Sequence, residues 1–247
     1  KQIFHWVHQK LVTEFSAMTD QPKTLLAKLE EAFYIAAPII ERRQEAKDGT
    51  VKYLLRMADG NCIETVVMRY HYGNTVCVST QVGCRMGCRF CATGRQGLQH
   101  SLSAAEILNQ IVSLPERDRL TNVVFMGMGE PLDNLDNVLR ALGIMTADWG
   151  FAWSPTRITL STAGVAPALR RFLDETKVHL AVSLHNPVHE ERAAIMPVER
   201  AWPIAEVVDI LRGYDFTHQR RVSFEYILMS GLNDSPRHIR ALCRLLD

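Results

Sequence analysis

The sequence has no long apolar run and almost no net charge. No segment approaches the roughly 18 consecutive apolar residues of a membrane helix, so we expect no membrane contact. The amino-terminal KQIFHWVHQK mixes polar and apolar residues, which is atypical of a secretory signal. Its 28 basic and 27 acidic residues give no bulk preference for a polyanionic partner. We therefore expect a cytoplasmic protein, in which the six cysteines are reduced and form no disulfide framework.

Acidic residues are missing from one long stretch of the chain. Between Glu64 and Glu106 there is no Asp or Glu, whereas four arginines fall inside: Arg69, Arg85, Arg89 and Arg95. A solvated basic loop explains this pattern. A surface that docks an anionic ligand or a nucleic acid explains it equally well. Both interpretations stay open at this point.

The first 70 residues divide into a helical part and a β-rich part. Residues 1 to about 45 are amphipathic, and Thr19 or Asp20 is predicted to cap a helix with Pro22 in its first turn. Two β-rich runs then flank Asp59-Gly60, which predicts a hairpin.

From Thr75 onward, short apolar runs alternate with helical patterns. The runs lie at 75–80, 122–126, 157–161, 178–185 and 222–229, and a helical pattern follows each of them. Ser103 and Glu106 are spaced as a capping box. Such alternation predicts an α/β fold with a parallel sheet, whose ligand sites lie at the carboxyl ends of the strands. The sequence stops after a helix, so an open sheet and a truncated barrel both fit.

A CxxxCxxC loop follows the first of these strands, with its thiols at Cys84, Cys88 and Cys91. A zinc site needs a fourth ligand, for which Cys77 or Cys62 is available. Three merely buried cysteines are unusual in a loop that also carries arginines and glycines. A 4Fe–4S cluster held by three thiolates leaves one iron open to a substrate. Gly83 and Gly87 permit a tight fold around such a cluster, and Phe90 can shield it from water.

Other polar residues also follow the predicted strands. Glu130 ends GMGEP, where Gly127 and Gly129 permit close backbone approach and the carboxylate can hold an ammonium group. Ser161 follows the third strand, and the Ser183–His185 segment follows the fourth. Taken singly, these residues are explained as a turn, a helix cap and a satisfied histidine. Their shared position at strand ends favours a ligand site.

Four segments together resemble one enzyme family. CVSTQVGCRMGCRFCATG, FMGMGEPLDN, RITLSTAGV and VSLHNP resemble the RlmN and Cfr ribosomal RNA adenine methyltransferases, which are radical S-adenosylmethionine (SAM) enzymes. The resemblance extends from about residue 3 to the end of the chain. It implies a partial (β/α) radical-SAM barrel, apparently truncated before its last strand. It also implies a 4Fe–4S cluster on the three loop cysteines, and SAM bound by Gly129, Glu130, Ser161, Ser183, Leu184 and His185.

The resemblance also implies a radical route to methylation. Carbon 2 or carbon 8 of adenine has no usable lone pair, so direct displacement of the SAM methyl group is not available. In the family, a methylated cysteine carries the methyl carbon to the base. The cysteine matched by Cys77 then resolves the adduct through a transient disulfide, and the glutamate matched by Glu64 removes the ring proton. The methyl-carrying cysteine lies in an ACGQ-like context beyond Asp247, so we expect a longer enzyme.

The expected activity is methylation of carbon 2 of an adenosine in 23S ribosomal RNA, with transfer RNA as a second candidate. GEPL and FEY (224–226) favour carbon 2 over carbon 8 of the Cfr branch. A different radical-SAM enzyme and a non-catalytic zinc-bound RNA-binding module are the alternatives. The expected electron donor is a flavodoxin or ferredoxin, and the expected state is a monomer. Three regions are predicted: a helical accessory RNA-binding region at 1–46, a β-hairpin extension at 47–74, and the radical-SAM core at 75–247.

Overall fold

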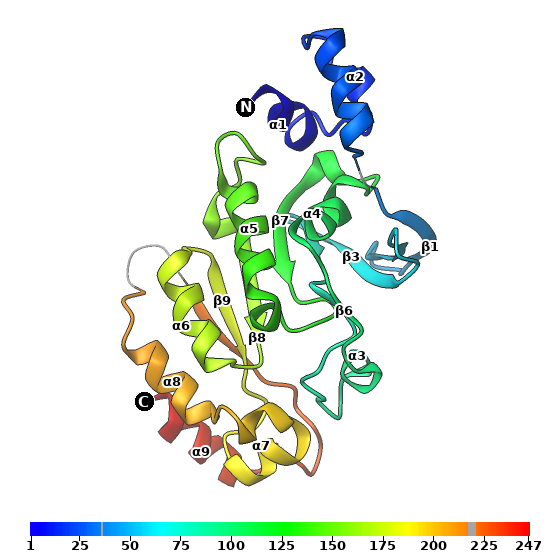
Figure 1. The fold of residues 1–247 in the computed structure, drawn as a ribbon. Helices are drawn as coiled ribbons and strands as arrows, with labels where there is room; N and C mark the ends of the chain where they lie inside the picture. Colours follow the sequence, from blue (N-terminus) through cyan, green and yellow to red (C-terminus); the bar gives the residue numbers. More distant parts are fainter. Residues whose placement is uncertain (36, 217–220) are drawn as a thin grey trace.

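The computed structural model describes residues 1–35, 37–216 and 221–247 (Figure 1). Within them, the main sheet has the strand order β1-β2-β3-β4-β7-β8-β9-β10, and a small ribbon pairs β5 with β6. The strands are β1 Ile39–Glu45, β2 Val51–Arg56, β3 Cys62–Tyr70, β4 Gly73–Cys77, β5 Gln81–Val82, β6 His100–Ser101, β7 Leu120–Phe125, β8 Ile158–Thr162, β9 His179–Ser183 and β10 Val222–Glu225.

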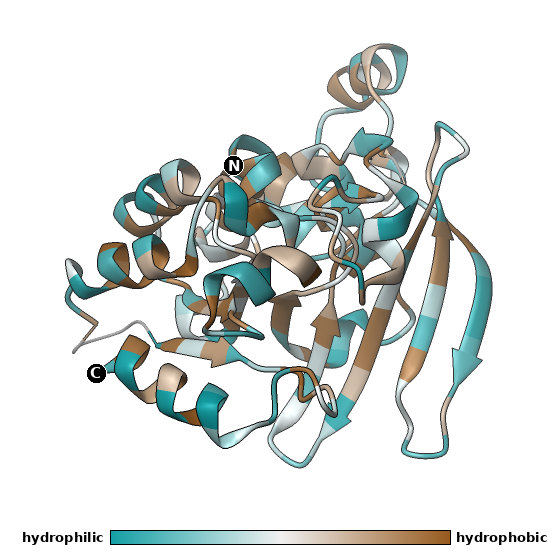
Figure 2. Ribbon diagram, turned by 90° about the horizontal axis from the view of Figure 1, so that it is seen from below, coloured by the Kyte–Doolittle hydropathy of each residue, from teal (hydrophilic) through white to brown (hydrophobic). Residues whose placement is uncertain are grey.

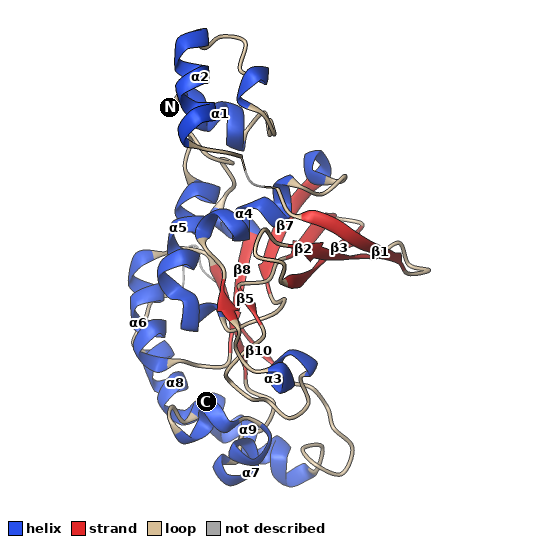
Figure 3. Ribbon diagram, turned by 45° about the vertical axis from the view of Figure 1, so that its right-hand side comes forward, coloured by secondary structure: helices blue, strands red, loops and turns tan. Residues whose placement is uncertain are grey.

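Helices cover one side of the parallel strands. In Figure 3, α5, α6 and α8 follow one side of the sheet, whereas the loop that carries α3 lies on the other. The α-helices are α1 Gln2–His8, α2 Lys23–Ala32, α3 Ala92–Gln96, α4 Ala104–Val112, α5 Leu135–Thr146, α6 Ala166–Glu175, α7 His189–Ile195, α8 Ile204–Arg212 and α9 Pro236–Leu246. Short 3-10 turns lie at Phe15–Ala17, Arg117–Arg119, Pro131–Asn134, Pro155–Arg157 and Pro197–Arg200.

Strands β4, β7, β8, β9 and β10 are parallel neighbours, and a helix follows each of them. The predicted series of strand–helix units is therefore confirmed, as is the Ser103–Glu106 capping box at the start of α4. In the part of the chain that the structure describes, the sheet is open and does not close into a barrel. Apolar residues of the strands pack against the helices, which carry hydrophobic and hydrophilic segments side by side (Figure 2).

The antiparallel half of the sheet differs in part from the expectation. Strands β2 and β3 form the predicted hairpin around Asp59-Gly60. The helical prediction is wrong for Ile39–Glu45, which form a strand paired with β2. Every residue of this strand is exposed. Its sequence, IIERRQE, therefore lacks the alternation that marks a half-buried strand, and backbone pairing rather than burial defines it.

The amino-terminal helices α1 and α2 lie beyond one end of the sheet (Figure 1). Pro22 is the N-cap of α2, so the predicted cap at Thr19 or Asp20 is wrong. Asp20 instead accepts a hydrogen bond from the Trp6 indole at 2.5 Å, which ties the start of α2 to α1. None of the helices formed by the described residues combines the length and the apolar character needed to cross a membrane.

One carboxylate connects the last helix to the rest of the molecule. Glu191 on α7 contacts His238 and Arg237 of α9, each at 2.6 Å, and accepts a hydrogen bond from Asn186 at 3.1 Å. The hydrogen bonds from His238 and Asn186, with a smaller part from Arg237, lower the pKa of Glu191 from 4.5 to about 2. A carboxyl group whose pKa is lower in the folded state stabilises the fold above its unfolded pKa.

We therefore expect the Glu191 contribution to be complete above pH 4.5 and to disappear as the pH falls toward 2. In the Glu191→Gln variant, the deficit in melting temperature relative to the parent should be largest at pH 5.5 and should shrink by pH 3. Scanning calorimetry at both pH values measures this difference. Glu190→Gln, an exposed neighbour on the same helix, is the control and should change little. A Glu191→Gln deficit that is the same at both pH values would contradict the assignment.

Candidate active site

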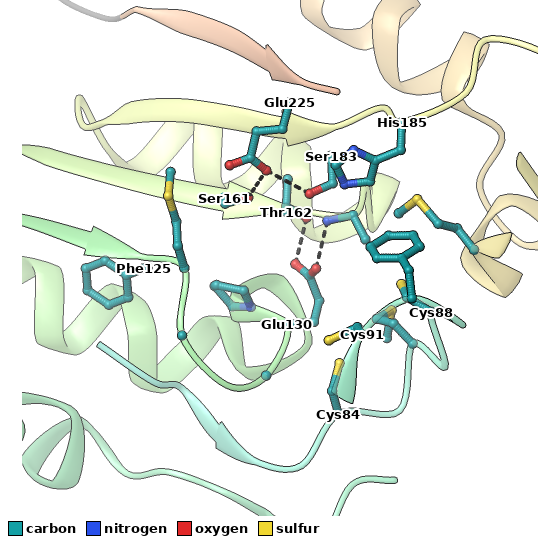
Figure 4. Close-up of a pocket in the computed structure, with 18 residues that line it drawn as sticks. Cys84, Cys88, Cys91, Phe125, Glu130, Ser161, Thr162, Ser183, His185 and Glu225 are labelled. Carbon is teal, nitrogen blue, oxygen red and sulfur yellow. Dashed lines mark hydrogen bonds between the residues drawn. The ribbon is translucent and has the colours of Figure 1, made fainter. Parts of the chain in front are cut away.

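One pocket opens at the carboxyl ends of β7, β8, β9 and β10, facing the cysteine loop (Figure 4). The predicted site residues that line it are Cys84, Cys88, Cys91, Gly129, Glu130, Ser161, Ser183 and His185. Leu184 does not line the pocket, because its side chain is fully buried in the core. The sequence analysis missed other lining residues: Met86, Met126, Thr162, Met196 and Glu225. Of these, Glu225 lies inside the predicted run 222–229, but the observed strand ends at Glu225 itself, which places this residue at a strand end.

The cysteine loop closes on itself through a tight backbone contact. The Cys84 N–H donates to the Gly97 carbonyl oxygen at 3.1 Å. Gly83 has φ +75°, and a Cβ atom there would lie only 1.8 Å from the same oxygen. Residue 83 must therefore be glycine for conformational and steric reasons.

Replacing Gly83 by alanine should open this loop, whereas Gly143 offers a matched control. Gly143 lies within α5 and an added Cβ meets nothing within 4 Å, so alanine should be neutral or slightly stabilising there. For Gly83→Ala we expect destabilisation of about 1–3 kcal/mol and lower iron uptake during anaerobic reconstitution. Urea unfolding and iron analysis of both variants measure this. Normal stability and iron uptake in Gly83→Ala would show that the loop tolerates the side chain.

The three loop thiols share one electrostatic environment. Burial raises the pKa of Cys84 to about 11 and that of Cys88 to about 12, and the neighbouring loop thiols add to both shifts. Without a cation nearby, the thiols of Cys84 and Cys88 stay protonated at neutral pH. A cationic metal centre favours their thiolate forms, so the donor set fits an iron–sulfur cluster.

In the described part of the chain, the possible ligand side chains do not gather around one point where a single metal ion could bind. Among the described residues, no group of three or more His, Cys, Asp or Glu side chains comes close enough to hold one ion. A tetrahedral zinc needs four donors about 2.0–2.3 Å from one point, so this arrangement does not match the zinc alternative.

The GMGEP loop is attached to the strand that precedes the cysteines. Ser79 Oγ accepts from the Met128 N–H at 2.9 Å, and Gln81 Oε1 accepts from the Glu130 N–H at 2.9 Å. At Gly129, with φ +102°, a Cβ atom would lie 2.6 Å from the Gln81 side chain. Gly127 is similarly confined by Ser79. The two glycines thus bring the loop onto Ser79 and Gln81, whose roles were not predicted.

Glu130 is a buried carboxylate that joins two strand ends. It is only 4% exposed, and both its oxygens accept hydrogen bonds: from the Thr162 hydroxyl at 2.6 Å, the Ala163 N–H at 2.8 Å and the Leu132 N–H at 3.0 Å. Burial raises the pKa of Glu130 to about 7, and these three donors oppose the shift. A cationic group beside it would favour the ionised form.

A fully buried arginine fixes the carboxyl ends of β8 and β9. The Arg192 guanidinium, on α7, donates to the carbonyl oxygens of Ser183 at 2.8 Å, Ala163 at 2.9 Å and Leu184 at 2.9 Å. It also forms an ion pair with Glu199, which is itself buried. The sequence analysis did not predict this residue. It holds two backbone segments beside the pocket in place, one after β8 and one at the end of β9.

His185 presents one defined nitrogen to the pocket. Its Nδ1 accepts from the Ile227 N–H at 3.2 Å, so the neutral ring carries its proton on Nε2. Burial lowers its pKa, which favours that neutral form. The backbone has φ +55°, unusual for a residue other than glycine, and Asn233 Nδ2 holds the His185 carbonyl at 2.6 Å. The Phe90 ring packs edge-on against the imidazole at 5.1 Å.

Glu64 and Cys77 do not line the pocket, but they share its sheet face. In register, Cys77 pairs with Val66 on one side and Val124 on the other. Glu64 lies two residues from Val66, and therefore on the same face. Glu64 forms an ion pair with Lys52 at 2.7 Å. Burial raises the pKa of Cys77 to about 11.

The same register extends across the parallel strands. Val124 pairs with Thr159, and Ser161, two residues farther on, pairs with Ala181. Ser183 follows on that face and pairs with Glu225. The candidate catalytic residues and the strand-end serines therefore belong to one continuous face of the sheet.

The remaining cysteines lie away from the pocket. Cys62 pairs with Arg56 at the start of β3, and it is not a pocket-lining residue. Cys243 is exposed on α9, whereas its apolar sequence context, IRALCRLL, predicts a place in the core; that prediction is wrong. All six cysteines are free thiols.

The cysteine loop, the strand-end pocket and the open parallel sheet together define a class of enzyme. Residues 78–243 match the Radical SAM superfamily, and residues 1–35 match the ribosomal RNA large subunit methyltransferase N-terminal domain. The crystal structure of a radical SAM methyltransferase from Sphaerobacter thermophilus superposes with a TM-score of 0.92 at 43% identity, covering 99% of this chain and 74% of that one.

Curated relatives narrow the class. A probable dual-specificity RNA methyltransferase RlmN of Parabacteroides distasonis is 53% identical over 246 residues, which cover 100% of this chain and 72% of the relative. The protein of the same description from Clostridium perfringens is 46% identical, with the same two coverages. The chain belongs to the RlmN family of radical-SAM methyltransferases. Membership of this superfamily implies a 4Fe–4S cluster and SAM as its cofactors.

Proposed function

We propose that the longer enzyme expected from this sequence methylates carbon 2 of an adenosine in 23S ribosomal RNA, with transfer RNA as a second substrate. The observation that carries the proposal is the convergence of three free thiols and four strand ends on one pocket. Relatives described as dual-specificity RNA methyltransferases support the RNA substrates. The GEPL and FEY segments support carbon 2 over carbon 8.

In this proposal each pocket residue has a defined task. Cys84, Cys88 and Cys91 hold the cluster, which supplies the electron for reductive cleavage of SAM. Glu130 offers an anionic surface to the amino group of SAM, although its two oxygens already accept three protein hydrogen bonds. His185 offers a donor at Nε2. Phe90 and Met196, which belong to one apolar cluster at the pocket, exclude water.

Glu64 and Cys77 are proposed to act on the adduct between RNA and the methyl-carrying cysteine rather than on SAM: Cys77 on the sulfur of that cysteine, and Glu64 on the ring proton of the base. Their place beside the pocket, on the same sheet face, supports this division. At a pKa of about 11, Cys77 is protonated at rest, so its thiol must lose a proton before it acts as a nucleophile. Lys52 holds the Glu64 carboxylate in place. Glu64 is then available as the acceptor of the ring proton.

Substrate binding is proposed to use the arginine-rich stretch and the first 46 residues. Arg69, Arg85, Arg89 and Arg95 are all exposed, which favours phosphate contacts without base reading. The target adenosine must leave its stack to reach the pocket. The three regions 1–46, 47–74 and 75–247 remain our division of the chain, with the strand β1 now included in the first. We further propose a monomer that takes its electron from a flavodoxin or ferredoxin.

Nucleoside mass spectrometry of ribosomal and transfer RNA tests this function. Cells that lack the gene should lack 2-methyladenosine, and the complementing holoenzyme should restore it. A Cys77→Ala variant should bind its cluster normally but fail to restore the mark, whereas Cys62→Ala should behave as the parent. Restoration of 8-methyladenosine instead would move the enzyme to the Cfr branch. No change in methyladenosine of either kind would reject the proposal.

A further inference from the structure

Glu225 is a pocket carboxylate that has no role in the binding of the cluster or in the proposed methyl transfer. It ends β10, next to β9 in the sheet, and its side chain lines the pocket and reaches the serines that end β8 and β9. Its Oε2 accepts from Ser161 Oγ at 2.7 Å and from Ser183 Oγ at 2.8 Å, as Figure 4 shows. Three polar groups from three strands thus form one cluster, which we call the acceptor cluster: Ser161, Ser183 and Glu225.

The number of hydroxyl protons in the acceptor cluster determines which hydrogen bonds it can form with a ligand. A serine hydroxyl has one proton, and both serines donate theirs to the Glu225 carboxylate. Towards a ligand, each serine can then only accept a hydrogen bond. Glu225 Oε1 has no partner among the described residues and is also an acceptor. The cluster therefore presents only acceptors and carries a negative charge.

The cluster is rigid, because the backbone of Glu225 is fixed. Glu225 is in register with Ser183 on the adjacent parallel strand. Its carbonyl oxygen accepts from the N–H groups of Leu184 at 3.1 Å and His185 at 3.2 Å. The carboxylate therefore stands on a paired strand, which preorganises it for a ligand.

We propose that Glu225 makes this part of the pocket selective for a nucleoside with a free cis-diol and excludes 3′-phosphorylated nucleosides. The inference rests on the proposed function, since it assigns a nucleoside cofactor to the pocket. Two ribose hydroxyls supply two donors to an acceptor-only cluster. A 3′-phosphate replaces one donor by an anion and faces the carboxylate directly.

This selectivity has a use in an enzyme that acts on RNA. Every internal RNA nucleotide carries a 3′-phosphodiester, whereas SAM has a free 2′,3′-diol. A cluster that rejects the phosphate keeps nucleotides of the substrate out of the cofactor half of the pocket. The target base then reaches only the half beside Cys77 and Met126. Glu225 is thus a specificity-determining residue for the cofactor, and it acts partly by orienting the two serines.

Competition binding to the cluster-loaded protein tests the proposal. S-adenosylhomocysteine is the bound probe, and adenosine, 2′-deoxyadenosine and adenosine 3′-monophosphate are the competitors. For the parent protein we expect adenosine to compete at least about tenfold better than 2′-deoxyadenosine and at least about tenfold better than adenosine 3′-monophosphate. In Glu225→Gln the charge is gone and the amide can donate to a serine. The preference for adenosine over adenosine 3′-monophosphate should then fall at least about tenfold.

Glu206→Gln, an exposed residue on α8, is the matched control and should keep the preferences of the parent. Iron content and melting temperature show that each variant is folded and loaded. An unchanged preference in folded Glu225→Gln overturns this inference but leaves the proposed function intact. Failure of the parent protein to bind S-adenosylhomocysteine at all overturns both.

Discussion

Replacement of Cys88 by alanine is expected to abolish cluster binding. Anaerobic reconstitution should load the parent chain with about four iron and four sulfide per protein, and the variant with little of either. The physical reason is that two thiolates cannot hold a cluster that three hold in the parent.

The chain supplies a matched control for this experiment. Cys243 is an exposed free thiol on α9, far along the sequence from the loop, and Cys243→Ala should load as the parent does. Iron and sulfide analysis and the visible absorption of both variants measure the effect. Equal loading of Cys88→Ala and the parent would show that the loop cysteines are not the ligands. One zinc per parent chain would instead support the alternative of a non-catalytic, zinc-bound RNA-binding module.

Replacement of Arg192 by methionine is expected to be the most destabilising single change in the fold. Arg192 is fully buried, and its removal takes the buried cation away from Glu199, which is 1% exposed and keeps only His189 and the Ile204 N–H as partners. It also leaves the Ser183 and Ala163 carbonyl groups without their donor. Breaking a buried ion pair from one side costs about 3–5 kcal/mol. We therefore expect a loss of stability of that size in urea unfolding, if the variant folds at all.

An exposed arginine provides the comparison. Arg171 pairs with Asp136 and Glu175 at the surface of α6, where its side chain is 49% exposed. Arg171→Met should cost less than about 1 kcal/mol, because exposed pairs contribute little. A double variant, Arg192→Met with Glu199→Leu, removes the orphaned charge and should recover part of the loss. Equal small effects at both arginines would contradict the role given to Arg192.

Much of the fold was predictable from local patterns. Apolar runs followed by helical periodicity located β7, β8 and β9 within a few residues. The reason is that a buried parallel strand has the form of a short, continuous apolar run, which is visible in the sequence. Asp59-Gly60 and the Ser103 capping box are local turn and cap chemistry, which the chain carries without tertiary help. The strand-end rule then brought Glu130, Ser161 and Ser183 to one pocket.

The parts that were not predicted depend on contacts between distant segments. Arg192 resembles any surface arginine of an amphipathic helix until the ends of β8 and β9 and the Glu199 carboxylate surround it. Glu225 gains its place only from the register of β9 and β10. Ile39–Glu45 pair as a fully exposed edge strand, which no hydrophobic period reveals. The exposure of Cys243 likewise depends on which face of α9 meets the body.

The central claim is that three thiolates leave one iron of the cluster open for SAM. Electron paramagnetic resonance of the anaerobic, dithionite-reduced protein tests it most directly. Addition of SAM should change the spectrum of the reduced cluster, because the amino and carboxyl groups of SAM ligate the open iron. A reduced cluster whose spectrum is identical with and without saturating SAM would contradict the account, as would a protein that binds no iron.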